Sequence, residues 1–198
     1  RPPERPLRRC ASTAIEPVLD GWCGSKVTRV VMVVHPSDEE LAAVARQRGV
    51  LVVQPDEPPP EMKDSVRLAL RALEEQGSPR KLDAWLLAPA DMPTLSGKVV
   101  DRLVDAYRQS LATEDAARAT IWVPAFEGRR GHPVLFPWSL AAEVSRLADD
   151  EGINALVRRH AVRTVDVATD AILDDLDTPE DYQRLRQRAD RPGGEAAD

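Results

Sequence analysis

AWLLAPADMP, residues 84–93, is the stretch that decides how the rest of the chain is read. Its first five residues are apolar and predict a short buried strand over 84–88. Asp91 follows this strand, so it would lie at the carboxyl edge of a sheet, where open α/β sheets bind ligands. Because Mg²⁺ favours one or two carboxylates together with water and phosphate oxygens, Asp91 could be a metal ligand. A simple turn-capping role beside Pro93 is the alternative.

On both sides of this stretch, short apolar runs alternate with longer amphipathic ones, which is typical of βαβ units and predicts an α/β fold with a mostly parallel sheet. Strands are predicted at residues 27–34, 50–53, 84–88 and 162–167, and paired β segments at 121–126 and 133–136. Helices are predicted at residues 7–19, from Ser37 as N-cap, at 62–75, 96–110, 140–147 and 153–160, and after Thr178.

Length and composition limit the classes of function. The 198 residues suit one domain, predicted here over 1–188 with a disordered tail at 189–198. A net charge of −6 gives no reason to expect nucleic acid as a partner, and no apolar run is long enough for a membrane helix. Cys10 and Cys23 lack metal-ligand spacing, so a reducing cytoplasm is expected. The chain opens on Arg1, and we expect further polypeptide before it.

A second acidic segment is ILDDLDTPEDY, residues 172–182. In an extended segment Asp175 and Asp177 point to the same face, which would suit a metal ion. Asp177 or Thr178 would also make a good N-cap before Pro179, so capping is the competing explanation. The two roles are compatible.

The third segment is EGRRGHPVLFP, residues 127–137. Gly128 and Gly131 would allow a tight turn with backbone amides facing a ligand. The arginines at 129–130 could meet phosphate and His132 could bond a substrate. An exposed hairpin turn is the simpler explanation and is favoured on the local pattern alone.

The fourth segment is PPPEMKDSV, residues 58–66. Met62 and Ser65, at a helix N-terminus, could form part of a base or phosphate pocket. Lys63 and Asp64 are expected to be solvated.

Four motifs, ADMP, GRRGHPVLF, DEGINALVRRH and DDLDTPEDY, occur in an order that resembles the MobA-like nucleotidyltransferase family. The molybdopterin cytidylyltransferase branch is the most similar. The resemblance covers roughly residues 5–185, and its specificity lies in the ordered set rather than in any single motif. EMKDSV also resembles the family's Met-x-x-Ser segment before a helix.

The resemblance implies a Rossmann-like three-layer α/β/α domain, monomeric and with Mg²⁺ as cofactor. It would transfer a nucleotidyl group from an NTP, with CTP favoured, to a small phosphorylated acceptor such as molybdopterin, releasing pyrophosphate. Asp91 and Asp177 would be catalytic, and Asp91, Asp175 and Asp177 would bind the metal. The implied substrate-binding residues are Met62, Ser65, Pro89, Gly131, His132, Pro133 and Asn154. A degenerate nucleotide-binding domain and a sugar-phosphate nucleotidyltransferase are the alternatives.

One departure from the family is large. The family opens with a strand and a Gly-rich basic loop, LAAGxSxRMGxxK, which holds the triphosphate and base, and residues 1–16 do not match it. The loop could precede this chain, be lost in a degenerate relative, or come from a partner chain. We therefore expect this polypeptide to be poorly active or inactive, with sheet edges left exposed.

Overall fold

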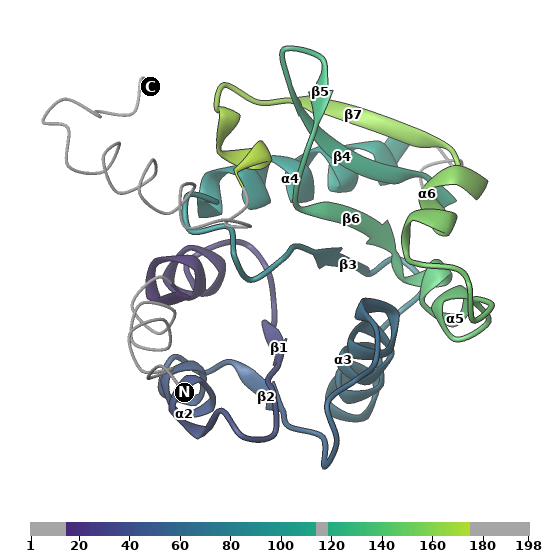
Figure 1. Cartoon of the computed structure of the whole chain (residues 1–198). Helices are drawn as coiled ribbons and strands as arrows, with labels where there is room; N and C mark the ends of the chain where they lie inside the picture. The colour runs from purple at the N-terminus through teal and green to yellow at the C-terminus, as the bar shows by residue number, and fades with distance from the viewer. Residues whose placement is uncertain (1–14, 114–118, 175–198) are drawn as a thin grey trace, which may run out of the picture.

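The computed structural model describes residues 15–113 and 119–174 and arranges them as strands with helices on both faces (Figure 1). The strands are β1 (Val31–Val33), β2 (Leu51–Val53), β3 (Ala84–Leu87), β4 (Ile121–Phe126), β5 (Arg129–Arg130), β6 (Val134–Pro137) and β7 (Val162–Asp166). The helices are α2 (Glu39–Gln47), α3 (Met62–Gly77), α4 (Gly97–Thr113), α5 (Ala141–Val144) and α6 (Asn154–Arg159), with 3₁₀ helices η2 (Trp138–Leu140) and η3 (Asp170–Leu173). Residues 15–23 are also helical.

The strands form two separate sheets within the described residues. β1 pairs with β2 in parallel, while the larger sheet has the order β3-β6-β4-β5, with β7 paired to β4. The predicted α/β class is confirmed. Parallel pairing is confined to β1 with β2 and β4 with β7, because β4 returns to β6 through a hairpin and hairpin strands run antiparallel.

Successive side chains of the larger sheet point to opposite faces, and each face has its own core. On one face Trp85 of β3 stacks on Phe136 of β6 with ring centroids 4.2 Å apart, under α3, α5 and α6. On the other face Trp122 and Leu135 pack against Leu103 of α4. The strands therefore lie between helical layers, and the three-layer α/β/α prediction is confirmed.

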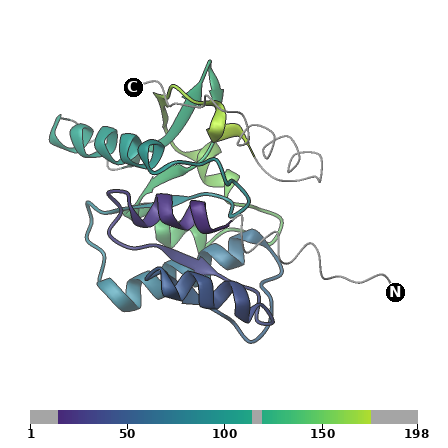
Figure 2. The same cartoon turned by 90° about the vertical axis from the view of Figure 1, so that its left-hand side faces the viewer.

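The smaller sheet has its own helical cover. Ile15, Val18 and Leu19 of the helical segment 15–23 share a buried cluster with Ala45 of α2 and Val50. Figure 2 views the molecule from the side on which this segment and α2 lie. None of the described helices combines the length and apolar character needed to cross a bilayer.

Several predicted boundaries differ from the observed ones; the helix predicted at 140–147, for example, is the short η2 and α5, which ends at Val144. The strand predicted at 27–34 is reduced to β1, and α2 begins after Asp38 rather than Ser37. The Asp38 carboxylate accepts a hydrogen bond from the Leu41 amide, whereas the Ser37 hydroxyl is paired with the His35 ring. Asp38 is the better cap because its acceptor reaches the third residue of the helix. The predicted domain end at residue 188 lies outside the described residues.

A buried and an exposed leucine should differ in how much stability is lost when each is replaced by alanine. Leu103 is fully buried, and Leu82 is 49% exposed. We expect Leu103→Ala to lower the free energy of unfolding by about 2–5 kcal/mol, because it leaves a cavity, and Leu82→Ala by less than about 1 kcal/mol. Urea denaturation of both variants measures the difference, and equal losses would contradict this placement of the core.

Candidate functional site

Three of the four sequence motifs meet in one buried apolar cluster. Met92 of the β3–α4 loop is 1% exposed and Ile172 of η3 is 0% exposed, and both belong to this cluster with Leu95 and Val99. Phe126, at the end of β4, packs against it. Asp91 precedes Met92, the 127–132 turn follows Phe126, and the acidic segment follows Ile172. The packing therefore brings the polar residues of three distant segments to one place.

Asp91 is exposed in the loop after β3, and its carboxylate has no hydrogen-bond or ion-pair partner among residues 15–113 and 119–174. Its neighbour Thr94 donates through Oγ1 to Oδ2 of Asp174, 3.5 Å away. Asp174 is the first residue after η3. The acidic segment thus begins beside the Asp91 loop, although Thr94 and Asp174 are 80 residues apart in the sequence.

Sequence reasoning overlooked Asp174 and Thr94. The available signal was the pair Asp174–Asp175 directly after the apolar residues Ile172 and Leu173, but the chosen pattern was the alternation of Asp175 with Asp177. Asp175 and Asp177 lie outside the described residues, so their predicted metal-binding role stays a prediction.

Gly131 fixes how the 127–132 turn meets η3. A Cβ atom at this position would overlap the carbonyl oxygen of Ile172, so only glycine permits this approach. The next amide, that of His132, donates to the same Ile172 oxygen at 2.9 Å, and the Gly131 amide donates to Pro124 O at 3.0 Å. The Gly131 amide thus bonds within the protein rather than facing a ligand, and the predicted role of Gly131 in substrate binding stays a prediction.

The tight turn uses Gly128, as predicted, but its other left-handed residue is Glu127 rather than Gly131. Its left-handed residues are Glu127, with φ 50°, and Gly128, with φ 78°. The short strand β5 follows and pairs with the end of β4. Both arginines of β5 are exposed, which leaves their guanidinium groups accessible to an anion. Pro133, joined to His132 by a cis peptide bond, is fully buried.

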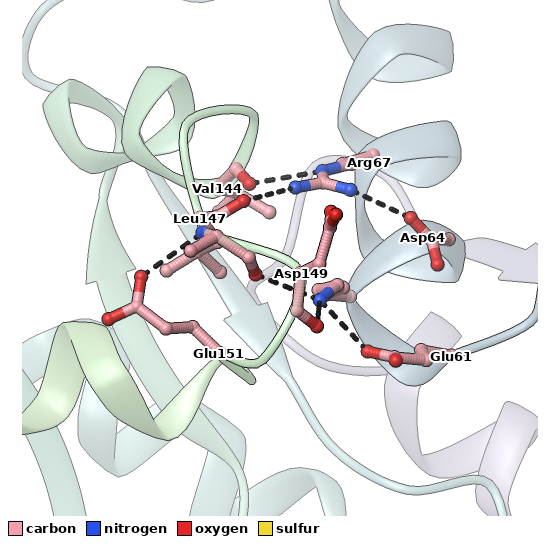
Figure 3. A network of polar contacts seen from close by, with 9 residues as sticks. Glu61, Asp64, Arg67, Val144, Leu147, Asp149 and Glu151 are labelled. Atoms are coloured by element: carbon pink, nitrogen blue, oxygen red, sulfur yellow. Dashed lines mark hydrogen bonds and ion pairs between the residues drawn. The ribbon is translucent and has the colours of Figure 1, made fainter.

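The fourth segment, residues 58–66, joins a polar network on α3 (Figure 3). Lys63 is only 4% exposed, and its Nζ donates to the carbonyl oxygens of Ala148, at 3.0 Å, and Asp149, at 2.5 Å. It also forms an ion pair with Glu61 at 3.0 Å. The prediction that Lys63 is solvated is wrong, because these main-chain oxygens replace its water.

Arg67, one helical turn after Lys63, extends the same network. Its guanidinium donates to the carbonyl oxygens of Val144 at 3.1 Å and Leu147 at 3.0 Å, and pairs with Asp64 at 2.8 Å. Two basic side chains of α3 thus bind four carbonyl groups, one at the last residue of α5 and three in the loop that follows it.

The loop between α5 and α6 is closed from its other side by Glu151. Its carboxylate accepts from the Ala148 amide at 3.1 Å and pairs with Arg159. The amide hydrogen bond and the arginine both lower the pKa of Glu151, so it is ionised in the folded protein. Asn154 begins α6 immediately after this loop.

The remaining predicted substrate residues have less defined surroundings. Met62 is 56% exposed at the start of α3, Ser65 is half-buried, and Asn154 is exposed. Pro89 is half-buried between β3 and Asp91. No described contact joins Met62, Ser65 or Asn154 to the Asp91 loop, so their roles stay predictions.

The described residues alone contain no group of three or more His, Cys, Asp or Glu side chains placed to hold a metal ion. Asp91 and Asp174 nevertheless offer the hard oxygen donors that Mg²⁺ or Mn²⁺ prefers. Asp91 is exposed and has no polar partner in the part of the chain that the structure describes, which leaves its carboxylate available to a ligand.

Residues 7–165 match the family described as the MobA-like NTP transferase domain. No curated protein matches the chain. Among solved structures, Rv0371c of Mycobacterium tuberculosis in complex with manganese is similar, with 23% identity, a TM-score of 0.69, and coverage of 88% of this chain and 86% of that one.

Two further solved structures share the fold. A nucleotidyl transferase from Methanothermobacter thermautotroptrophicus is 19% identical, with a TM-score of 0.68 and coverage of 88% of this chain and 79% of that one. A 4-diphosphocytidyl-2C-methyl-D-erythritol synthase is 18% identical, with a TM-score of 0.65 and coverage of 89% and 90%. At these identities the likeness concerns the fold.

The close approach of Gly131 to Ile172 predicts the effect of one methyl group. We expect Gly131→Ala to lower the free energy of unfolding by about 1–3 kcal/mol, because the backbone of η3 must move to admit the Cβ atom. Gly152→Ala is the control, since a Cβ atom there meets nothing within 4 Å, and we expect a change within about 0.5 kcal/mol. Equal effects in chemical denaturation would disprove the role given to Gly131.

Replacing the buried Lys63 should cost more stability than replacing an exposed lysine. Lys63→Met keeps the length of the side chain but leaves two loop carbonyls without their donor, and we expect a loss of about 1–3 kcal/mol in unfolding free energy. Lys98→Met, at an exposed position of α4, should change it by less than about 0.5 kcal/mol. A Lys63→Met variant as stable as the Lys98→Met variant would show that the network is not structural.

Proposed function

Because the chain belongs to the MobA-like NTP transferase family, we propose that it transfers a nucleotidyl group from CTP to a small phosphorylated acceptor such as molybdopterin. The reaction joins an acceptor phosphate oxygen to the α-phosphorus of the triphosphate. The bond between the α-phosphorus and the bridging oxygen to the β-phosphate breaks, and pyrophosphate leaves. The enzyme would act as a cytoplasmic monomer.

The observation that supports this proposal most strongly is the convergence of Asp91, Asp174 and the His132 turn on one buried cluster. The convergence lies at the carboxyl end of β3, where ligands of α/β sheets bind. It brings the carboxylates of Asp91 and Asp174 together with the exposed arginines of β5. Such a site suits a metal-bound polyphosphate better than a neutral ligand.

A divalent cation is needed because carboxylates and a triphosphate repel one another. Asp91 and Asp174, with the predicted ligands Asp175 and Asp177, would hold Mg²⁺. When bound, the ion screens the phosphate oxygens and the charge that develops on the leaving pyrophosphate.

The chain's own residues would position the reactants. Asp91 is held at its place because the next residue, Met92, is locked in the cluster with Ile172. His132 is fixed by the hydrogen bond from its backbone amide to the Ile172 carbonyl oxygen, and its ring would donate a hydrogen bond to the acceptor. Positioning of this kind supplies much of the rate enhancement in phosphoryl-type transfer, since little covalent chemistry is required of the protein.

CTP rather than another triphosphate is proposed because the ordered motifs resemble the cytidylyltransferase branch most closely. Met62, Ser65, Pro89 and Asn154 would contact the nucleotide or the acceptor. The same resemblance supports molybdopterin as the acceptor.

The test is pyrophosphate release by the full-length protein with Mg²⁺, each NTP in turn, and molybdopterin. We expect release with CTP, reduced at least about 100-fold in kcat/KM by Asp91→Asn, which keeps the size of the side chain and removes its charge. Asp56→Asn, in an exposed acidic loop away from the cluster, is the matched control and should retain activity.

Normal turnover in a folded Asp91→Asn protein would overturn the proposal. CTP binding without pyrophosphate release would indicate a degenerate nucleotide-binding domain. Faster release with a sugar phosphate than with molybdopterin would point to the other class of transferase.

A further inference from the structure

The two arginines of β5, Arg129 and Arg130, stand on a tight hairpin that fixes their directions. Only Glu127 and Gly128 connect β4 to β5, and their φ angles of 50° and 78° are those of a two-residue hairpin turn. β5 folds back on the end of β4 (Figure 1). Because the length and type of such a turn fix the register, each arginine has one defined partner on β4.

These partners place Arg129 on the face of the candidate site. Arg129 is paired with Phe126, and Arg130 is paired with Ala125. Directly opposed residues of an antiparallel pair carry their side chains on the same face of the sheet. Phe126 packs against the buried cluster that contains Ile172. Arg129 therefore extends from the face on which that cluster lies.

Arg130 extends from the other face. Side chains alternate along β4, and Ile121 and Val123 belong to the core under α3, α5 and α6. Ala125 is buried and follows in the same alternation, so it lies on that face too. The two arginines are thus directed to different surroundings, although they are adjacent and chemically identical in the sequence.

The position of Gly131 supports the same direction for Arg129. The Gly131 amide donates to the Pro124 oxygen, which continues the pairing of β5 with β4 by one residue and keeps 129–131 extended. Residues two apart in an extended segment point to the same face. A Cβ atom at Gly131 would be directed at Ile172, so the side chain of Arg129 is directed toward η3 as well. β5 and η3 are also in contact.

Carboxylates lie on the side of the molecule toward which Arg129 is directed. Asp91 adjoins the same buried cluster, and Asp174 is the first residue after η3. The Arg129 side chain is exposed and has no hydrogen bond or ion pair within residues 15–113 and 119–174, whereas Arg48 and Arg67 are each paired with carboxylates. The guanidinium of Arg129 is therefore accessible to an anion on the side where Asp91 and Asp174 offer oxygen donors to a cation.

We propose that Arg129, and not Arg130, binds a phosphate group of the metal-bound polyphosphate at the candidate site. The guanidinium group is a planar fork that matches two phosphate oxygens. A polyphosphate keeps negative charge after it has bound one divalent cation, and a cation on the η3 side offsets part of that charge. The assignment rests on the proposed function in one respect, which is that the ligand is a polyphosphate.

Two substrates of the proposed reaction carry phosphate, and Arg129 is assigned to the triphosphate. It shares its face with Asp91 and Asp174, which would hold the cation, so it is placed for the phosphates that the cation binds. These are the phosphates of the triphosphate and of the pyrophosphate that leaves it. A phosphorylated acceptor carries a phosphomonoester instead, which allows the two sources to be separated by experiment.

The test compares Arg129→Gln with Arg130→Gln in the full-length protein, because the two variants remove the same charge from adjacent exposed positions. Arg129→Lys keeps the charge and removes the planar fork. Isothermal titration calorimetry in the presence of Mg²⁺ measures the Kd of CTP, of inorganic pyrophosphate and of glycerol 3-phosphate, a phosphomonoester. Both side chains are exposed, so we expect all variants to have the urea midpoint of the unaltered protein.

We expect Arg129→Gln to raise the Kd of CTP and of pyrophosphate at least about tenfold, Arg129→Lys to raise it less, and Arg130→Gln to raise it less than about twofold. Equal losses in the two glutamine variants, or no binding of pyrophosphate by the unaltered protein, would overturn the assignment. A loss confined to glycerol 3-phosphate would move Arg129 to the acceptor and would also overturn it.

The result is independent of turnover. A protein that binds pyrophosphate through Arg129 but releases none from CTP would refute the proposed transfer and retain the assignment of Arg129. A protein that releases pyrophosphate from CTP with equal affinity in the two glutamine variants would do the reverse.

Discussion

The contact between Gly131 and Ile172 is the constraint on which the candidate site depends. The absence of a side chain at Gly131 lets the η3 backbone approach, and the same carbonyl oxygen then accepts the His132 amide. Ile172 is thereby buried against Met92, which carries Asp91 on its amino-terminal side. One small residue thus connects the hairpin, the acidic segment and the β3–α4 loop, and none of these segments would hold its polar groups in place alone.

A second set of contacts stabilises the face of the larger sheet that α3 and α5 cover. Lys63 and Arg67 tie α3 to the carbonyl groups at the end of α5, and Glu151 closes the following loop. α3 also lines a cavity between the two sheets. It packs against β1 on one side and against Trp85 of β3 on the other, so one helix bridges two sheets whose described strands are not hydrogen-bonded to each other.

Much of this fold could be predicted from the sequence, because apolar runs such as that of β3 and amphipathic runs such as α3 have distinct periods. The position of Asp91 after β3 followed from the same local pattern. The burial of Lys63, the contact of Thr94 with Asp174, and the use of the Gly131 amide by Pro124 could not be predicted. The first two depend on a carbonyl or carboxylate supplied by a segment distant in sequence, and the third depends on how the hairpin folds back on β4. A local pattern of charged or small residues is the same whether such a partner is present or solvent takes its place.

In the proposed site a divalent cation and a nucleotide meet at the Asp91 loop, η3 and the His132 turn. Paramagnetic broadening of amide resonances by Mn²⁺, in the full-length protein with CTP present, tests this directly. We expect the amides of Asp91, Thr94, His132 and Asp174 to broaden first and Asp91→Asn to weaken the effect. Broadening centred instead on the acidic loop at Asp56 and Glu57, with the Asp91 loop unaffected, would contradict it.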